Sequence, residues 1–346
     1  MSDANKSPAR GREKTATLRN VAERAGVSHA AVSRTFTEGG SVSAEMRRKV
    51  EKAARELGYF PNALASSLTT GRTKLIGLIA DNFDNPFFLK IFDLLTYALQ
   101  EKNLRPLLIN LRDETDPKSS IRLLRQYSVE GVLLAASNRP VGFATAIRNA
   151  GLPVVHTFGP IRNSPSVHVV GIDNIEAGRM AARTLIKRGY RCIGFIGGTE
   201  ATGTTQGRMS GFLEEAALHP DVIATHSFAG NYSFDSGYSE MSRLLTGDKA
   251  EAYFCADDIL SIGAISAIQD AGLNVPGDVG ILGLNDMEMA HWRNIRLTTI
   301  RQPVREIVTS SIELLTAILD DMDRHPETRT FACELIERAT LKPLQN

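Results

Sequence analysis

The chain has 346 residues, of which 42% are hydrophobic and 23% charged, and its formal net charge is only +1. This composition is typical of a globular protein that is too long for one hydrophobic core. No apolar run approaches the length of a membrane span and the N-terminus carries no signal-peptide core, so we expect a cytoplasmic protein rather than a membrane-spanning or exported one. The cysteines, Cys192, Cys255 and Cys333, show no CxxC spacing and are expected to be reduced thiols.

The charges are unevenly distributed along the chain. Residues 1–74 carry 14 Lys and Arg against 7 Asp and Glu, a net charge of +7, whereas the remainder carries 26 against 32, a net charge of −6. A basic N-terminal piece on an acidic body favours a DNA-binding head. Residues 1–16 are polar and basic, and we expect them to form a disordered arm that adds non-specific attraction to phosphates.

The stretch 18–37 predicts two short helices joined by a tight corner. Apolar side chains recur at the i, i+3, i+4 and i+7 positions of the first helix, which are Leu18, Val21, Ala22 and Ala25. Gly26 can end this helix with a positive φ at no steric cost. Ser28 is a suitable N-cap for the helix that follows.

The second helix of this pair has one apolar face and one small polar face. Val32 and Phe36 share the buried side, and His29 lies in the first turn. The opposite side carries Ala30, Ser33, Arg34 and Thr37. A small polar face with one arginine predicts a helix-turn-helix that enters the DNA major groove. The alternative is an ordinary corner between two helices.

A third helix and a hinge follow the helix-turn-helix. The helix is expected over 44–57, with Ser43 as its cap and Gly58 at its end. Its basic residues lie off the apolar face, where they can meet phosphates: Arg47, Arg48, Lys52 and Arg55. Pro61 then suits the first position of a helix of about two turns, which is too short to be stable alone. A plain linker is the alternative, but linkers seldom carry leucines four residues apart, as at Leu64 and Leu68.

From residue 74 the pattern changes to alternating strands and helices, which predicts two doubly wound parallel-sheet lobes. Ligands of such folds bind at the carboxyl ends of the strands, here between the lobes. We expect the chain to cross back near 297–302. The expected strands are 75–80, 105–110, 129–135 and 153–156, then 192–196, 252–255 and 279–284, with a late helix over 304–321 and a last strand over 330–337.

Four residues are candidates for ligand contact in this cleft. Phe87 and Phe88 can lay a ring face against a sugar or a base, or one of them caps the core of its lobe. Arg208, at the start of a helix, works against the helix dipole, so it either captures a hydroxyl pair or carboxylate or forms a surface salt bridge. Asp257 either accepts hydroxyls of a ligand or caps the next helix.

Several motifs, in this order and spacing, carry a family resemblance. They are TLRNVAERAGVSHAAVSRTF, VSAEMRRKVEKAARELGYFPNALASSLTTGRTKLIGLI, DNPFF, VGIDNIEAGRMAARTLIKRGYRCIGFIGG, GRMSGF, ADDILSIGAI and LTTIRQP. The chain resembles the LacI/GalR family of bacterial repressors over nearly its whole length. The resemblance implies an all-α helix-turn-helix head, joined by a hinge helix to a body of two doubly wound lobes like those of periplasmic binding proteins.

The resemblance also implies domain boundaries. These are a basic arm over 1–16, a helix-turn-helix domain over 17–60, a hinge over 61–73, and a body over 74–346. The N-lobe of the body would comprise about 74–172 and 301–325, and the C-lobe about 173–298 and 328–340. In the family, two hinge helices form in the DNA minor groove, where a leucine matching Leu68 wedges between base pairs and the position matching Leu64 faces its mate.

The resemblance implies two sets of contact residues. Those on DNA are Leu18, Ser28, His29, Ala30, Ser33, Arg34, Asn62, Ala65 and Leu68. Those on the effector are Phe87, Phe88, Arg208, Tyr232, Asp257 and Asn285. The family usually shows asparagine in place of Asp257 and often aspartate in place of Asn285, and many relatives have an aspartate near Phe158, so the polar pattern of the ligand stays open.

The leading hypothesis is a homodimeric repressor that binds a pseudo-palindromic operator under control of a small effector, with a sugar or sugar derivative favoured. An activator, a corepressor-dependent regulator like the purine member of the family, and a solute-binding protein without a DNA role are the alternatives. No cofactor or metal is expected. An enzyme is disfavoured because GxGxxG, GxxxxGK[ST], GxSxG and HExxH motifs are absent. The chain has no heptad tail, so we expect dimers rather than tail-built tetramers.

Overall fold

The computed structural model describes residues 16–37, 39–80, 82–111, 116–135, 142–161, 164–247 and 249–344. The chain divides into two compact units, Met1–Thr73 and Lys74–Asn346. The expected basic arm, apart from Ala16, lies outside the described residues. No helix in the described ranges is both long and apolar enough to cross a membrane.

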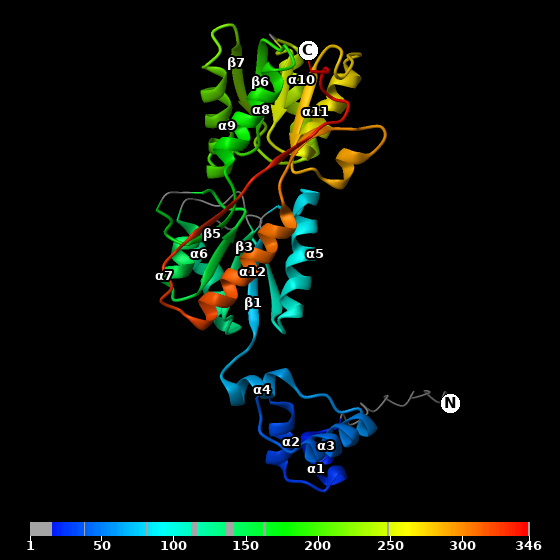
Figure 1. Cartoon of the computed structure of the whole chain (residues 1–346), viewed down its shortest axis with the longest axis vertical. Coiled ribbons are helices and arrows are strands. Elements are labelled where there is room, and N and C mark those ends of the chain that lie inside the picture. Colours follow the sequence, from blue (N-terminus) through cyan, green and yellow to red (C-terminus); the bar gives the residue numbers. More distant parts are fainter. Residues whose placement is uncertain are drawn as a thin grey trace, which may run out of the picture. The chain divides into compact units, whose positions relative to one another are not determined.

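The first unit is helical and consists of α1 (Leu18–Ala25), α2 (His29–Phe36), α3 (Ala44–Leu57) and α4 (Ala63–Thr70), which are the blue elements of Figure 1. Gly26 and Gly58 end α1 and α3 with φ of 64° and 61°, a conformation that only glycine adopts freely. Ser28 and Ser43 cap α2 and α3. The core is formed by Val21, Ala22, Val32, Val50, Ala53 and Ala54. The predicted helix-turn-helix is confirmed.

Two details of this unit differ from the prediction. Pro61 does not open α4, because the helix begins at Ala63 and its first turn is closed by the amide of Ser66 on the carbonyl of Asn62. Arg47 does not extend toward solvent. Its guanidinium donates to the carbonyl oxygens of Thr35, at 2.8 Å, and Gly40, and so ties α3 to the end of α2.

The first lobe of the second unit is a six-stranded sheet in the order β11-β5-β4-β3-β1-β2, in which the paired strands are parallel. Its strands are β1 (Leu75–Ala80), β2 (Arg105–Asn110), β3 (Gly131–Ala135), β4 (Val154–Thr157), β5 (His168–Ile172) and β11 (Thr328–Phe331). The helices α5 (Pro86–Glu101) and α12 (Val304–Asp320) pack together on one side of the sheet. The helices α6 (Pro117–Gln126) and α7 (Phe143–Asn149) pack against a separate apolar cluster of this lobe.

The second lobe is a six-stranded sheet in the order β12-β10-β9-β8-β6-β7, parallel except for β12, which runs antiparallel to β10. Its strands are β6 (Cys192–Gly197), β7 (Ile223–Phe228), β8 (Ala252–Cys255), β9 (Gly280–Leu284), β10 (Thr298–Arg301) and β12 (Glu334–Ile336). The helices α8 (Asn174–Ile186) and α9 (Gly203–Ala216) pack as a pair, as do α10 (Phe234–Leu245) and α11 (Asp258–Asp270). A 3-10 turn, η1 (Glu288–His291), precedes β10.

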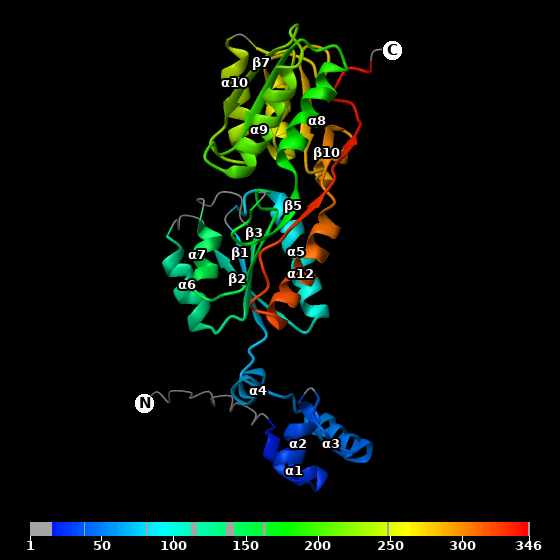
Figure 2. The ribbon, with the colours of Figure 1, turned by 60° about the vertical axis from the view of Figure 1, so that its left-hand side comes forward.

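The chain crosses between the lobes after β5, after β10 and between β11 and β12, and the red segment in Figure 2 is the last of these crossings. The strand predicted over 330–337 is therefore wrong, because two short strands, β11 and β12, belong to different sheets. Residues 328–331 accordingly lie in the first lobe, although they were expected in the second. β10 likewise pairs with β9 in the second lobe, so the chain crosses only after Arg301.

Candidate functional site

The exposed face of α2 carries the residues predicted to read DNA. The Ser28 hydroxyl accepts the amide of Ala31 at 3.2 Å and fixes the start of the helix. His29, Ala30 and Arg34 are exposed, and Ser33 is half-buried. None of the ion pairs among the described residues includes Arg34, so its guanidinium is available to an external acceptor.

The remaining residues predicted to contact DNA are distributed differently. Leu18 is half-buried and packs against the core of the helical unit. Asn62 and Ala65 are exposed beside or on α4, and the Leu68 side chain is 89% exposed. The side chain of Leu64 lies outside the described residues. An apolar side chain as exposed as Leu68 has no fold-stabilising role within its own helix, which is consistent with a wedge for a partner surface.

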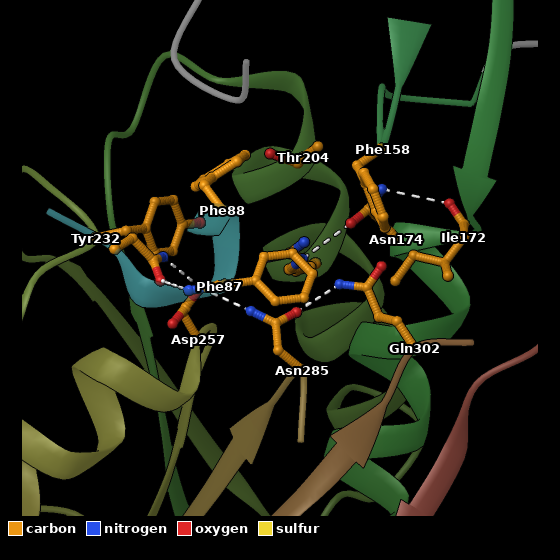
Figure 3. Close-up of a pocket in the computed structure, with 12 residues that line it drawn as sticks. Phe87, Phe88, Phe158, Ile172, Asn174, Thr204, Tyr232, Asp257, Asn285 and Gln302 are labelled. Atoms are coloured by element: carbon orange, nitrogen blue, oxygen red, sulfur yellow. Dashed lines mark hydrogen bonds between the residues drawn. The ribbon is translucent and has the colours of Figure 1, made fainter. Parts of the chain in front are cut away.

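The second unit contains a small cavity at the carboxyl ends of both sheets. Its free volume is about 30 Å³, which holds water but no sugar. The cavity brings together all six residues predicted to contact an effector. Its lining comprises Asn85, Phe87, Phe88, Phe158, Ile172, Asn174, Thr204, Arg208, Tyr232, Asp257, Asn285 and Gln302 (Figure 3).

Three phenylalanine rings form a row across this cavity. Phe87 lies in the middle, with its ring centroid 5.9 Å from that of Phe88 and 5.7 Å from that of Phe158, both in edge-on geometry. Figure 3 shows the Phe87 ring between the Tyr232 side and the Phe158 side of the lining. Phe88 was expected either to contact the ligand or to cap the core of its lobe. The structure combines the two positions, because the side chain packs in the lobe core and also lines the cavity.

A buried carboxylate, Asp257, links the two lobes. Its Oδ2 accepts the side-chain amides of Asn85, at 3.0 Å from the first lobe, and of Asn285, at 2.8 Å. Its Oδ1 accepts the amide of Ile259 at 2.9 Å and so caps α11. Burial raises the pKa of the Asp257 carboxyl to about 6, against the opposing effect of these hydrogen bonds. Asp257 thus caps a helix and faces the cavity at the same time.

The cavity also contains a buried cation. Arg208 is 8% exposed, and its Nε donates to Asn174 Oδ1 at 2.9 Å while its Nη1 donates to the Ala256 carbonyl at 2.7 Å. A surface salt bridge is excluded by this burial. The α9 backbone places the guanidinium in the cavity, and Asn174, at the start of α8, holds its plane.

Tyr232 closes the cavity from the second lobe. Its hydroxyl hydrogen-bonds Thr205 Oγ1 at 2.6 Å, and its backbone carbonyl accepts the side-chain amide of Asn82, from the first lobe, at 3.2 Å. Tyr232 therefore participates in a second polar contact between the lobes.

Sequence reasoning missed five polar residues of this region, namely Asn82, Asn85, Asn174, Thr204 and Gln302. Gln302 Nε2 donates to Asn285 Oδ1 at 2.5 Å and extends the chain that begins at Asn85 and passes through Asp257. Gln302 could have been predicted as a cavity residue, because it directly follows a strand at the point where the chain crosses between the lobes. Asn174 lies in the first turn of α8 and Thr204 in the first turn of α9, so the positions of both resemble ordinary helix starts.

Comparisons with known proteins agree with this architecture. Residues 17–62 match the family described as bacterial regulatory proteins, lacI family, and residues 182–341 match a periplasmic binding protein-like domain. The chain is 33% identical over 335 residues to the HTH-type transcriptional repressor PurR of Yersinia pestis, a match that covers 94% of this chain and 97% of that protein.

Two solved structures show the same arrangement of elements. The lac repressor dimer bound to operator and the anti-inducer ONPF has a TM-score of 0.83 at 24% identity, covering 94% of this chain and 99% of that one. The complex of the transcriptional regulator CelR with cellobiose has a TM-score of 0.69 at 27% identity, with the same coverage. The chain with its helix-turn-helix unit and two-lobed body belongs to the LacI family of DNA-binding transcriptional regulators.

Proposed function

We propose that this regulator is a cytoplasmic repressor whose affinity for its operator is set by a small molecule bound between the two lobes. The observation that carries the proposal is the polar chain of Asn85, Asp257, Asn285 and Gln302. It joins side chains of both lobes in a buried cavity that is also lined by aromatic rings. A ligand that replaces any of these hydrogen bonds changes how the lobes close, and so shifts the balance between two states of the body.

The DNA-binding role is assigned to the exposed face of α2. Arg34 would contact base edges, with His29 and Ala30 tuning the half-site. Two copies of the head would read a pseudo-palindrome, which requires a homodimer. The exposed Leu68 would act as the minor-groove wedge. The relatives are transcription regulators rather than enzymes, and we assign no catalytic role to the cavity.

The effector is proposed to be a small hydroxylated ring, either a sugar or a sugar derivative. Rings such as Phe87 and Phe88 suit the apolar face of a sugar, and amides with a carboxylate suit its hydroxyls. The solved CelR relative binds cellobiose, which supports a carbohydrate. The PurR relatives keep open a corepressor in place of an inducer.

Two experiments test this function together. Selection of genomic fragments by the full-length protein should enrich a pseudo-palindromic sequence, and one that enriches none contradicts the DNA-binding role. Thermal-shift screening of the same protein against sugars, sugar acids, polyols and purines should then find a stabilising class, because a ligand that binds the folded body raises its melting temperature. A protein that no compound stabilises would be a constitutive binder.

A further inference from the structure

The cavity contains a guanidinium, that of Arg208, which forms no ion pair with any of the described residues. Arg208 is buried, yet none of the ion pairs among the described residues includes it. The carboxylate of Asp257 lines the same cavity and interacts electrostatically with Arg208, but its oxygens accept hydrogen bonds from Asn85, Asn285 and the Ile259 amide and form no ion pair with the guanidinium. Taking a charge out of water without a paired counter-charge is costly. A buried, unpaired guanidinium in a ligand cavity therefore favours an anionic ligand group.

A second donor faces the same cavity and has no partner. Thr204 is 5% exposed, and its Oγ1 makes no hydrogen bond. The hydroxyls of the neighbouring residues Thr202 and Thr205 bond each other at 2.7 Å, whereas that of Thr204 bonds neither of them. Thr204 and Arg208 are four residues apart on α9, which places them on one face of the helix. Both line the cavity, and Figure 3 shows Thr204 at its edge near Phe88.

The N-terminus of α9 is a third feature that favours binding of an anion. Thr202 caps the amide of Thr205, which leaves the amides of Gly203 and Thr204 without a partner inside the helix. α9 has 14 residues and no acidic residue in its first turn, so its own sequence does not neutralise the positive end of the helix dipole. Helix N-termini of this kind bind carboxylates and phosphates.

We propose that the effector carries a carboxylate, which binds at the N-terminus of α9 between Thr204 and the guanidinium of Arg208. The inference rests on the proposed function and narrows its ligand class to a small hydroxylated carboxylic acid, such as a sugar acid. The carboxylate accepts the free Thr204 hydroxyl and the remaining Arg208 donors, while the hydroxyls of the ligand face Asp257 and Asn285. A phosphate is disfavoured because it brings three terminal oxygens and more charge than one guanidinium neutralises.

The test is a thermal-shift series on the full-length protein at constant ionic strength. Sodium D-gluconate, sodium D-galacturonate and sodium acetate are compared with D-glucose, D-galactose and D-glucose 6-phosphate, with sodium chloride as the reference. We expect at least one of the hydroxylated acids to raise the melting temperature by about 2–4 °C or more at saturation. Acetate should give a smaller shift, and the neutral sugars none.

Two matched variants test whether the response comes from this subsite. Thr204→Val removes only the unpartnered hydroxyl, so the unliganded variant should melt at the same temperature as the parent or higher. Its affinity for the stabilising acid should fall at least tenfold. Thr225→Val, an exposed substitution on β7, should change neither quantity. A Thr204→Val protein that is destabilised without ligand, or that responds fully to the acid, overturns the assignment.

The remaining outcomes separate this inference from the proposed function. Stabilisation by the neutral sugars but not by the acids overturns the carboxylate subsite and leaves the effector-controlled regulator intact. A larger shift with D-glucose 6-phosphate than with the acids overturns the choice of carboxylate. No shift with any of the probes overturns the inference, and selection of operator fragments then decides separately whether DNA binding stands.

Discussion

Asn85, in the first lobe, donates a hydrogen bond of 3.0 Å to Asp257, in the second lobe, and each of these residues also caps a helix. Asn85 Oδ1 accepts the amide of Phe87 at 3.0 Å, and Asp257 Oδ1 accepts that of Ile259 at 2.9 Å. The contact between the lobes is therefore made by two helix starts that are already fixed.

Because Asp257 accepts a hydrogen bond from Asn285, exchanging the two residues should have a predictable effect on stability. Asp257→Asn turns an amide group toward the donors of Asn85 and Asn285, and we expect it to destabilise the body by about 1–3 kcal/mol. Asn285→Asp alone places two carboxylates together and should also destabilise. The double variant restores one donor–acceptor pair and should recover about 0.5–3 kcal/mol relative to the sum of the single effects. Chemical unfolding measures all four proteins, and strictly additive losses would contradict the pairing.

Asp258 predicts a pH dependence of stability. Burial raises the pKa of its carboxyl to about 7, despite hydrogen bonds from Thr299 and the Met287 amide. Because this pKa lies above the unfolded value of about 3.9, the folded protein binds more protons in between, and stability falls as the pH rises from about 4 to 7. Asp258→Asn cannot ionise and should remove the contribution of Asp258 to this fall, leaving that of Asp257, whose pKa burial raises to about 6. Melting temperatures across the range test it, and an unchanged slope would refute it.

The pKa of Asp286 is shifted in the opposite direction to that of Asp258, so its effect on stability has the opposite pH dependence. Burial opposes its ionisation, but Arg301 at 2.7 Å and Arg338 at 2.6 Å hold the pKa of Asp286 below its ordinary value. Its contribution is thus present above the unfolded pKa and is lost as the pH falls through the lower folded value. The slope attributed to Asp258 lies at higher pH, so the two groups are separable.

Arg34 predicts a loss of specificity in DNA binding. Arg34→Ala should weaken operator binding by about 1–3 kcal/mol per contacted base pair while leaving binding to random duplex largely intact. Fluorescence anisotropy with both duplexes gives the comparison. Arg19→Ala, an exposed arginine paired with Glu23 on α1, serves as the control. Equal losses on operator and random DNA would show that Arg34 contacts phosphates only.

If Leu68 is a minor-groove wedge, the effect of removing it on operator affinity should depend on how easily the DNA is kinked. Leu68→Ala should weaken binding to an operator with a flexible central pyrimidine–purine step more than to one with a stiff centre, because only the kinked site accommodates the wedge. Gel-shift titrations on the two operators measure the difference. A loss of the same size on both would remove Leu68 from the wedge role.

Local sequence patterns predicted most of the fold. Apolar spacing with Gly26 and Gly58 defined the head, and apolar runs located most strands of the body. β5 and β10 were not predicted as strands, although both lie inside their sheets. β7 was missed because Thr225 and His226 interrupt an edge strand that is partly exposed. The two strands over 328–336 were merged because a chain that changes sheets leaves no local signal of the change.

The candidate cavity was predicted residue by residue, but its pairings were not. Phe87, Arg208 and Asp257 follow from strand ends and family motifs. The contact of Arg208 with Asn174, and the unpaired hydroxyl of Thr204, depend on how α8 packs against α9. Such relationships join segments far apart in the chain, and no periodicity encodes them.

The most direct test of effector control is the operator affinity of the full-length protein with and without a compound that stabilises the body. The account predicts that saturating compound changes the Kd by about 5–150-fold, the usual range of coupling between two sites. Arg208→Gln, which removes the cavity cation, should abolish that change while still binding operator. An operator Kd that stays the same at every concentration of a bound, stabilising compound would contradict it.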